Sequence, residues 1–82
     1  MAMTEQAISE VPEWTFGDRL RKAREHRKME QSEMADALGV SRAVVSKWER
    51  GSQPRNLFEV VQRWSEVTGV PAQWLLGVSA SG

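Results

Sequence analysis

The sequence predicts an all-α domain in which five short helices surround one hydrophobic core. Apolar residues recur at helical spacing in the expected helices, as Val60, Val61 and Trp64 do. Gly39 and Gly69 fall between expected helices, where a residue that readily takes positive φ ends a helix. A chain of 82 residues has room for one small domain.

The first helix is expected to begin at about Phe16. Thr15 and Asp18 have the spacing of a capping box, and the carboxylate also suits the positive end of a helix. Phe16, Leu20 and Ala23 recur on one helical face and form its buried stripe.

Two short helices joined by a tight turn are expected over residues 31–51. Met34 and Leu38 give the first of them an apolar stripe, and Gly39 allows the turn. Ser41 is a good N-cap for the second helix, because its hydroxyl can accept from an unpaired amide.

The second helix of this pair separates an inner face from an outer face. Val45 and Trp48 are three residues apart and point back to the helix before it. The outer face carries Arg42, Ala43, Ser46 and Lys47. This is a helix-turn-helix pattern.

Two more helices complete the expected fold. Asn56 and Glu59 have the spacing of a capping box and open a helix that reaches about Val67. Gly69 ends this helix, and Pro71 suits the first position of a last short helix. Trp48 and Trp64 are expected to anchor the core.

The chain resembles the DNA-binding domain of the lambda-type repressor and Cro family over roughly residues 16–77. The matching positions are Gln31, Ala35, Gly39, Val45 and the ending Trp48-Glu49-Arg50-Gly51. The resemblance implies a compact five-helix, lambda-repressor-like domain. Glu30 departs from the family, which commonly has Thr, Asn or Ser at this N-cap, so the helix start is expected to fray or to be capped by another group.

The resemblance also implies sequence-specific binding of double-stranded DNA, with the helix over 41–50 in the major groove. Arg42 is the best expected base reader, since a guanidinium can donate two hydrogen bonds to guanine. Ala43 and Val44 could meet a thymine methyl group, and Lys47 could reach a base or a phosphate. Ser46 is a weaker candidate.

Other residues are expected to hold the DNA backbone or to support the site. Gln31, at a helix start, suits a phosphate, and Ser41, Ser52 and Arg55 could anchor the far side. By resemblance, Gln31 can also brace the first residue of the recognition helix. The resemblance further implies a structural ion pair that ties the first helix to the recognition helix, formed by Arg24 and Glu49.

Eleven basic and eleven acidic residues cancel, although many nucleic-acid-binding domains are strongly basic. Between Arg19 and Arg55, however, the chain has ten basic residues and only five acidic ones. Residues 1–13 are acidic and are expected to form a flexible arm, residues 14–77 the DNA-binding domain, and residues 78–82 a tail or a truncated linker. A molecule with one basic face can bind DNA despite a zero net charge.

A single recognition helix reads few base pairs, so a homodimer on an operator with half-sites about 10 bp apart is expected. Its contact is expected to involve Trp74, Leu75 and Val78. A phage- or prophage-type repressor in the cytoplasm of a bacterium or phage-infected cell is the favoured function. The alternative is an antitoxin or another protein-interaction module of the same fold, with DNA binding secondary and a protein as the partner.

Other function classes have little support in the sequence. The chain has one histidine and no cysteine, and no residue spacing that would hold a metal, so neither an enzyme nor a metal site is expected. No cofactor is expected. No stretch reaches the roughly 18 apolar residues that would cross a membrane.

Overall fold

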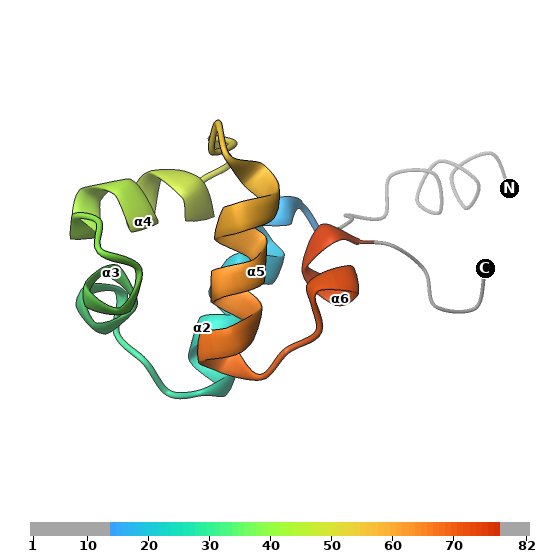
Figure 1. The fold of residues 1–82 in the computed structure, drawn as a ribbon, viewed down its shortest axis with the longest axis horizontal. Coiled ribbons are helices and arrows are strands. Elements are labelled where there is room, and N and C mark those ends of the chain that lie inside the picture. The colour runs from blue at the N-terminus through green and yellow to red at the C-terminus, as the bar shows by residue number, and fades with distance from the viewer. Residues whose placement is uncertain (1–13, 78–82) are drawn as a thin grey trace, which may run out of the picture.

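The computed structural model describes residues 14–77, which form helices and connecting loops without any strand (Figure 1). The helices in this part of the chain are α2 (Phe16–His26), α3 (Gln31–Leu38), α4 (Arg42–Glu49), α5 (Leu57–Thr68) and α6 (Ala72–Leu76). The all-α prediction is confirmed, and each expected helix is present. The predictions for the arm over 1–13 and the tail over 78–82 lie outside the described residues.

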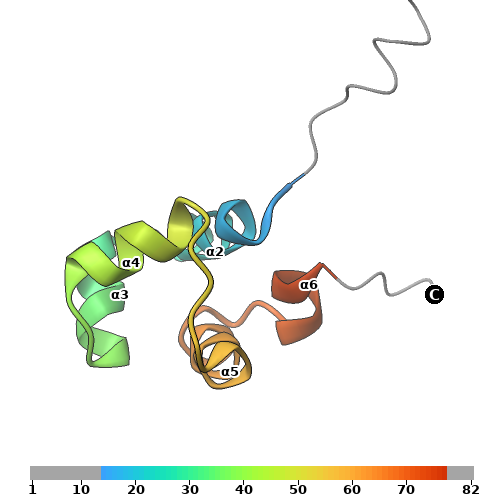
Figure 2. The same ribbon diagram turned by 90° about the horizontal axis from the view of Figure 1, so that it is seen from above.

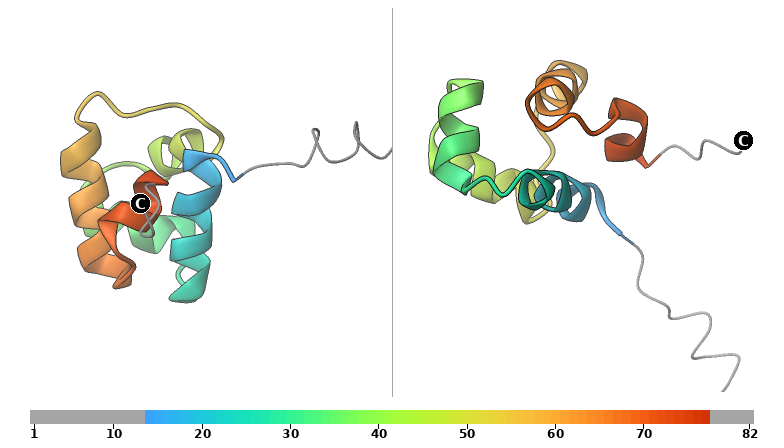
Figure 3. Two further views of the ribbon diagram at one scale, coloured as in Figure 1. Left: turned by 90° about the vertical axis from the view of Figure 1, so that its right-hand side faces the viewer. Right: turned by 90° about the horizontal axis from the view of Figure 1, so that it is seen from below.

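The helices pack around one core. α3 and α4 cross steeply at one side of the molecule, and α6 lies at the opposite side (Figures 1 and 2). Viewed from that side, α6 lies between α2 and α5 (Figure 3, left). The buried core consists of Leu20, Ala23, Met34, Ala35, Val45, Val60, Val61, Trp64 and Leu75.

Trp64 lies at the centre of this core and is completely buried. Its indole N–H donates a hydrogen bond of 3.0 Å to the carbonyl oxygen of Leu20, so the polar atom of the ring is satisfied inside the core. Trp48 is only half-buried and packs against the core from its edge. The prediction of a core anchor therefore holds in full for Trp64 and only in part for Trp48.

Side-chain hydrogen bonds cap three helix starts, as the sequence predicts. The Thr15 hydroxyl accepts from the amide of Asp18 at 3.1 Å, while the Asp18 carboxylate accepts from the amide of Thr15 at 3.0 Å. The Ser41 hydroxyl accepts from the amide of Val44 at 3.2 Å. At the start of α3, the Glu33 carboxylate accepts from the amide of Glu30 at 2.7 Å, so another group does cap that start.

The expected capping box at the start of α5 is wrong. The Asn56 side chain accepts no hydrogen bond from a helix amide, because its backbone, with φ −100° and ψ 61°, departs from the extended conformation of an N-cap. Its amide group instead donates to the Glu59 carboxylate at 3.1 Å.

The capping box at the start of α2 gives the stability a defined pH dependence. The pKa of Asp18 is lowered chiefly by a hydrogen bond with the backbone amide of Thr15. A hydrogen bond with the Thr15 side chain and the nearby charge of Arg21 lower it further. A carboxyl whose pKa is depressed on folding stabilises the fold above its unfolded pKa of about 3.9, and this contribution disappears as pH falls through the folded pKa. We expect the free energy of unfolding to decrease as the pH is lowered past about 4. The Asp18→Asn substitution should make this decrease smaller. Urea titrations of both proteins at about pH 5 and about pH 3 measure it, and equal drops in the two would contradict the assignment.

The first turn of α2 lies directly against the end of α4. A methyl group at Gly17 would stand 2.9 Å from the carbonyl oxygen of Trp48 and closer still to that of Glu49. Both obstacles are backbone atoms, so glycine allows the two helices to approach at this point. The contact sets how α4 lies relative to the rest of the domain.

Aromatic and basic side chains join α2 to α6. The ring of Trp14 meets the ring of Trp74 edge to face, with centroids 5.8 Å apart. Arg19 lies over the Trp74 ring at 5.1 Å and donates to the Trp74 carbonyl oxygen at 3.1 Å. Lys22 lies over the Trp14 ring at 5.7 Å. Trp14 therefore folds back against α2.

Candidate nucleic-acid interface

α4 turns a polar face away from the core. Arg42, Ala43 and Lys47 are exposed, whereas Val45 is completely buried. Val44 and Ser46 are half-buried. Every α4 residue predicted to face DNA thus keeps some solvent-accessible surface, and the most accessible ones lie along one side of the helix.

Charges of opposite sign are separated across α4 and the loop after it. From Ser41 to Arg55 all four basic residues are exposed, namely Arg42, Lys47, Arg50 and Arg55. The one carboxylate in this stretch belongs to Glu49, which is 7% exposed. The outer surface of α4 and its loop is therefore positively charged, in a chain whose net charge is zero.

Glu49 is held by Arg24 of α2 in a buried, two-pronged ion pair. The Arg24 guanidinium donates from Nε to Oε2 at 2.6 Å and from Nη2 to Oε1 at 3.0 Å. Its third nitrogen, Nη1, donates to the carbonyl oxygen of Met29 at 2.8 Å. Hydrogen bonding to Glu49 raises the pKa of Arg24, against the opposing effect of burial, so Arg24 stays charged at neutral pH.

Gln31 extends this pair to the start of α4. Its side-chain amide donates to Oε1 of Glu49 at 3.0 Å, and its carbonyl oxygen accepts from Nη1 of Arg42 at 3.1 Å. Hydrogen bonds thus run from Arg24 of α2 to Glu49 at the end of α4, then to Gln31 of α3, and return to the start of α4 at Arg42. The exposed guanidinium of Arg42 is oriented by a chain that begins in the buried part of the domain.

The loop after α4 continues the polar surface. The amide of Ser52 donates to the carbonyl oxygen of Lys47 at 3.1 Å, which holds the loop against the last turn of α4. Ser52 is half-buried, Pro54 is buried and Arg55 is exposed. Ser41 is exposed, but its hydroxyl is already used as the N-cap.

Arg50 also belongs to this surface, although the sequence pattern alone did not predict it as a DNA contact. It is exposed, and its guanidinium donates to the hydroxyl of Ser46. Its spacing indicates this position, because Arg50 lies seven residues, or about two helical turns, after Ala43 and therefore on the same side of the helix. Ser46, which was expected to be an exposed candidate, is partly covered by this contact.

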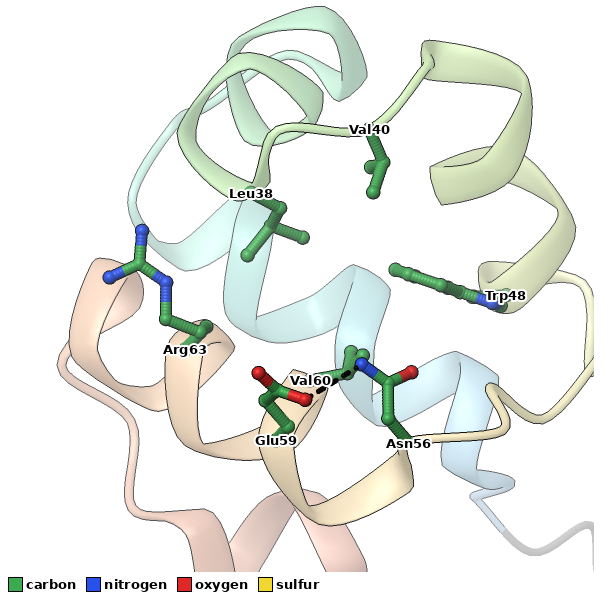
Figure 4. A pocket seen from close by; sticks show the side chains of 7 residues that line it. All are labelled: Leu38, Val40, Trp48, Asn56, Glu59, Val60 and Arg63. Atoms are coloured by element: carbon green, nitrogen blue, oxygen red, sulfur yellow. Dashed lines mark hydrogen bonds between the residues drawn. The ribbon is translucent and has the colours of Figure 1, made fainter.

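A groove of about 260 Å³ lies on the inner side of α4 (Figure 4). Leu38, Val40, Trp48 and Val60 supply its apolar walls, and the edge of the Trp48 ring points into it. Its polar rim is internally paired: Asn56 donates to Glu59 at 3.1 Å, and Arg63 donates to the Ala37 carbonyl oxygen at 2.9 Å. The groove therefore separates α4 from α5, and its polar side chains are hydrogen-bonded within the domain.

The predicted dimer contact needs one correction. Leu75 is 0% exposed and belongs to the core, so it cannot contact a second copy of the chain. Helical spacing could not separate it from Trp74, which is half-buried. Val78 lies outside the described residues.

In residues 14–77, no group of three or more His, Cys, Asp or Glu side chains is placed to hold a metal ion. None of the helices in that range has the length and apolar character needed to cross a membrane.

Comparison with known proteins agrees with this geometry. Residues 20–75 match the helix-turn-helix family. The chain is 39% identical over 70 residues to the HTH-type transcriptional regulator DicA of Escherichia coli (strain K12). That alignment covers 82% of this chain and 49% of DicA, so the chain spans about half the length of this curated relative.

No solved structure shows a significant match to the chain. The family is non-enzymatic, which confirms the expectation that the chain is not an enzyme. The chain belongs to the Cro/C1-type helix-turn-helix family, and its described helices have the lambda-repressor-like fold of that family.

Proposed function

We propose that the protein is a transcriptional regulator that binds double-stranded DNA by placing α4 in the major groove. The observation that carries this proposal is the separation of charge across α4. The basic side chains from Ser41 to Arg55 are exposed, and the one carboxylate is buried against Arg24. Such a surface attracts phosphates and places donors where base edges would lie.

The residues of this surface have different roles in the proposal. Arg42 reads a base, because its guanidinium lies at the N-terminal end of α4 and is oriented by Gln31. Lys47 contacts a base or a phosphate, and Ala43 and Val44 supply apolar contacts. The phosphate contacts come from Gln31, Ser41, Ser52, Arg50 and Arg55. Ser46 has a minor role because it already accepts from Arg50.

We expect Arg42→Ala to weaken binding to the preferred DNA site by roughly 1–3 kcal/mol and to relax the preference at one base pair. The reason is the loss of a two-pronged contact to one base. Electrophoretic or fluorescence titrations with a panel of single-base variants of the site measure both effects. Equal weakening on specific and random DNA would contradict base reading by Arg42.

Arg55→Gln is the matched control for this prediction. As a phosphate contact, Arg55 carries no sequence information, so its loss should weaken all DNA sequences similarly. It should also reduce the slope of log affinity against log salt by about 1. A change in base preference with Arg55→Gln would assign this residue a different role.

The finer proposal is a phage- or prophage-type repressor that binds its operator as a homodimer. One α4 reads too few base pairs for a useful site, so two copies on half-sites about 10 bp apart are proposed. Since Leu75 is buried, the proposed contact uses the accessible part of Trp74. The proposal places the protein in the cytoplasm of a bacterium or a phage-infected cell.

Selection of bound sequences from random double-stranded DNA, at near-physiological salt, tests the function. Enrichment of an inverted repeat with half-sites one turn apart supports a dimeric operator-binding regulator. Enrichment of a single half-site supports DNA reading but contradicts the dimer. No enrichment overturns the proposal and favours the protein-interaction alternative, an antitoxin or a related module.

A further inference from the structure

A second hollow lies on the far side of α2 from α4, against the connection between α5 and α6. It has a volume of about 310 Å³ and is lined by Lys22, Ala23, His26, Val70, Pro71 and Trp74. None of these residues belongs to the proposed DNA surface. Its size is at the lower end of the range for small-molecule sites.

The lining of this hollow combines an apolar floor with basic side chains at its edge. Ala23, Val70, Pro71 and the Trp74 ring form an apolar floor, and Lys22 and His26 supply the polar groups at its edge. No carboxylate lines it. The groove beside Trp48 is different, because it contains both Glu59 and Arg63 and their partners are already in place.

The acidic residue closest in the chain does not line this hollow. Glu25 lies in a neighbouring hollow of about 310 Å³, which also contacts Lys22 and His26. Its carboxylate faces Arg21, with Oε2 at 3.9 Å from Nε. Within residues 14–77, neither Lys22 nor His26 forms a salt bridge. The edge of the hollow therefore offers the ammonium group of Lys22 and an imidazole N–H of His26 to an anionic ligand.

We propose that this hollow binds a small apolar monocarboxylate. The apolar body of the ligand packs on Trp74, Val70 and Pro71, and its carboxylate accepts hydrogen bonds from Lys22 and His26. An aryl or short acyl group fits a space of about 310 Å³. The Lys22 ammonium lies over the Trp14 ring at 5.7 Å but forms no salt bridge within residues 14–77, so it can still donate to a carboxylate. The inference does not depend on the proposed DNA binding, although Trp74 also belongs to the proposed dimer contact.

Trp74 makes the occupied state observable. The same indole that forms the floor is held by Arg19 at 5.1 Å and meets the Trp14 ring at 5.8 Å. A ligand on the free part of the ring would change the environment of both tryptophans. It would also stabilise the attachment of α6 to α2, because it binds only the folded arrangement.

The test titrates the full 82-residue chain with phenylacetate and follows amide and indole resonances by NMR. Two analogues of matched size are titrated in parallel: 2-phenylethanol, which is neutral, and phenethylamine, which is cationic. The expected result is a saturable shift that maps to Lys22, His26, Val70 and Trp74, with phenylacetate binding more tightly than either analogue.

Two variants separate a built site from general attraction to a basic protein. Lys22→Gln keeps most of the side-chain stem and should weaken phenylacetate binding roughly threefold to tenfold, as loss of a charge-assisted hydrogen bond requires. Lys28→Gln removes an exposed cation outside the hollow and should leave the affinity unchanged. No saturable shift, equal binding of the neutral alcohol, or equal weakening in the two variants would overturn the proposal.

Discussion

Replacing Glu49 by alanine is expected to lower the free energy of unfolding by about 3–5 kcal/mol. The substitution leaves the buried guanidinium of Arg24 without the carboxylate that accepts two of its hydrogen bonds, at 2.6 and 3.0 Å. An unpaired buried charge is among the largest single-residue penalties. For a domain whose total stability is on the order of 5 kcal/mol, most of the fold would be lost.

Urea unfolding followed by circular dichroism measures this change, with Glu66→Ala as the matched control. Glu66 also pairs with an arginine, Arg63 at 3.4 Å, but both side chains are about half exposed. Exposed pairs contribute roughly 0–1 kcal/mol, so Glu66→Ala should change little. If the two variants lost similar stability, the buried pair would not have the role assigned to it.

A double substitution separates stability from DNA binding. Arg24→Met with Glu49→Leu removes both charges, and apolar replacement of a buried pair is often neutral or stabilising. The double variant should therefore fold again. Gln31 would still have lost its partner Glu49, so DNA affinity should remain reduced. Full recovery of affinity would show that the chain of hydrogen bonds to Arg42 does not matter for binding.

Replacing Gly17 by alanine is expected to destabilise the domain by about 1–3 kcal/mol or more. Glycine within a helix normally costs roughly 0.5–1 kcal/mol relative to alanine, so the same change at an uncrowded position would be stabilising. Here the added methyl group meets the backbone carbonyls of Trp48 and Glu49, which cannot move aside by changing rotamer. The sign of the effect is therefore diagnostic.

Thermal and urea unfolding measure the stability, and a titration under fully folded conditions measures DNA affinity. Gln62→Ala, at an exposed position of α5, is the control and should change stability by no more than about 0.5 kcal/mol. Because the methyl group displaces the end of α4, the DNA affinity of the folded variant should also fall. A stabilised Gly17→Ala variant would mean that α2 and α4 do not pack as closely as described.

The parts of this fold that were predictable from sequence are those fixed by neighbours in the chain. The turn at Gly39, with φ 73°, and the caps at Thr15 and Ser41 depend on residues no more than a few positions apart. The capping box at Asn56 shows the limit of such reading. The residue types and spacing are right, but the preceding loop gives Asn56 a backbone conformation that turns its side chain toward Glu59 instead.

Residues whose role depends on distant partners could not be placed by spacing alone. Gln31 and Glu49 are 18 positions apart, and only the resemblance implied that Gln31 braces the recognition helix. By its sequence position, Gly17 is only a poor helix former within a helix. Its role in packing follows from its close approach to the end of α4. Leu75 and Trp74 are adjacent in the same short helix, yet only Leu75 reaches the core.

The hydrogen bond from Arg42 to Gln31 has a thermodynamic consequence for recognition. A free arginine side chain carries about 2 kcal/mol of rotamer entropy, much of which is lost when it orders on a ligand. Gln31 restricts Arg42 before any ligand arrives, so part of that entropy is lost on folding instead of on association. Under the proposed function, Gln31→Ala would leave the guanidinium intact and yet make binding entropically less favourable. Calorimetry would detect that difference where an inventory of contacts in the complex would not.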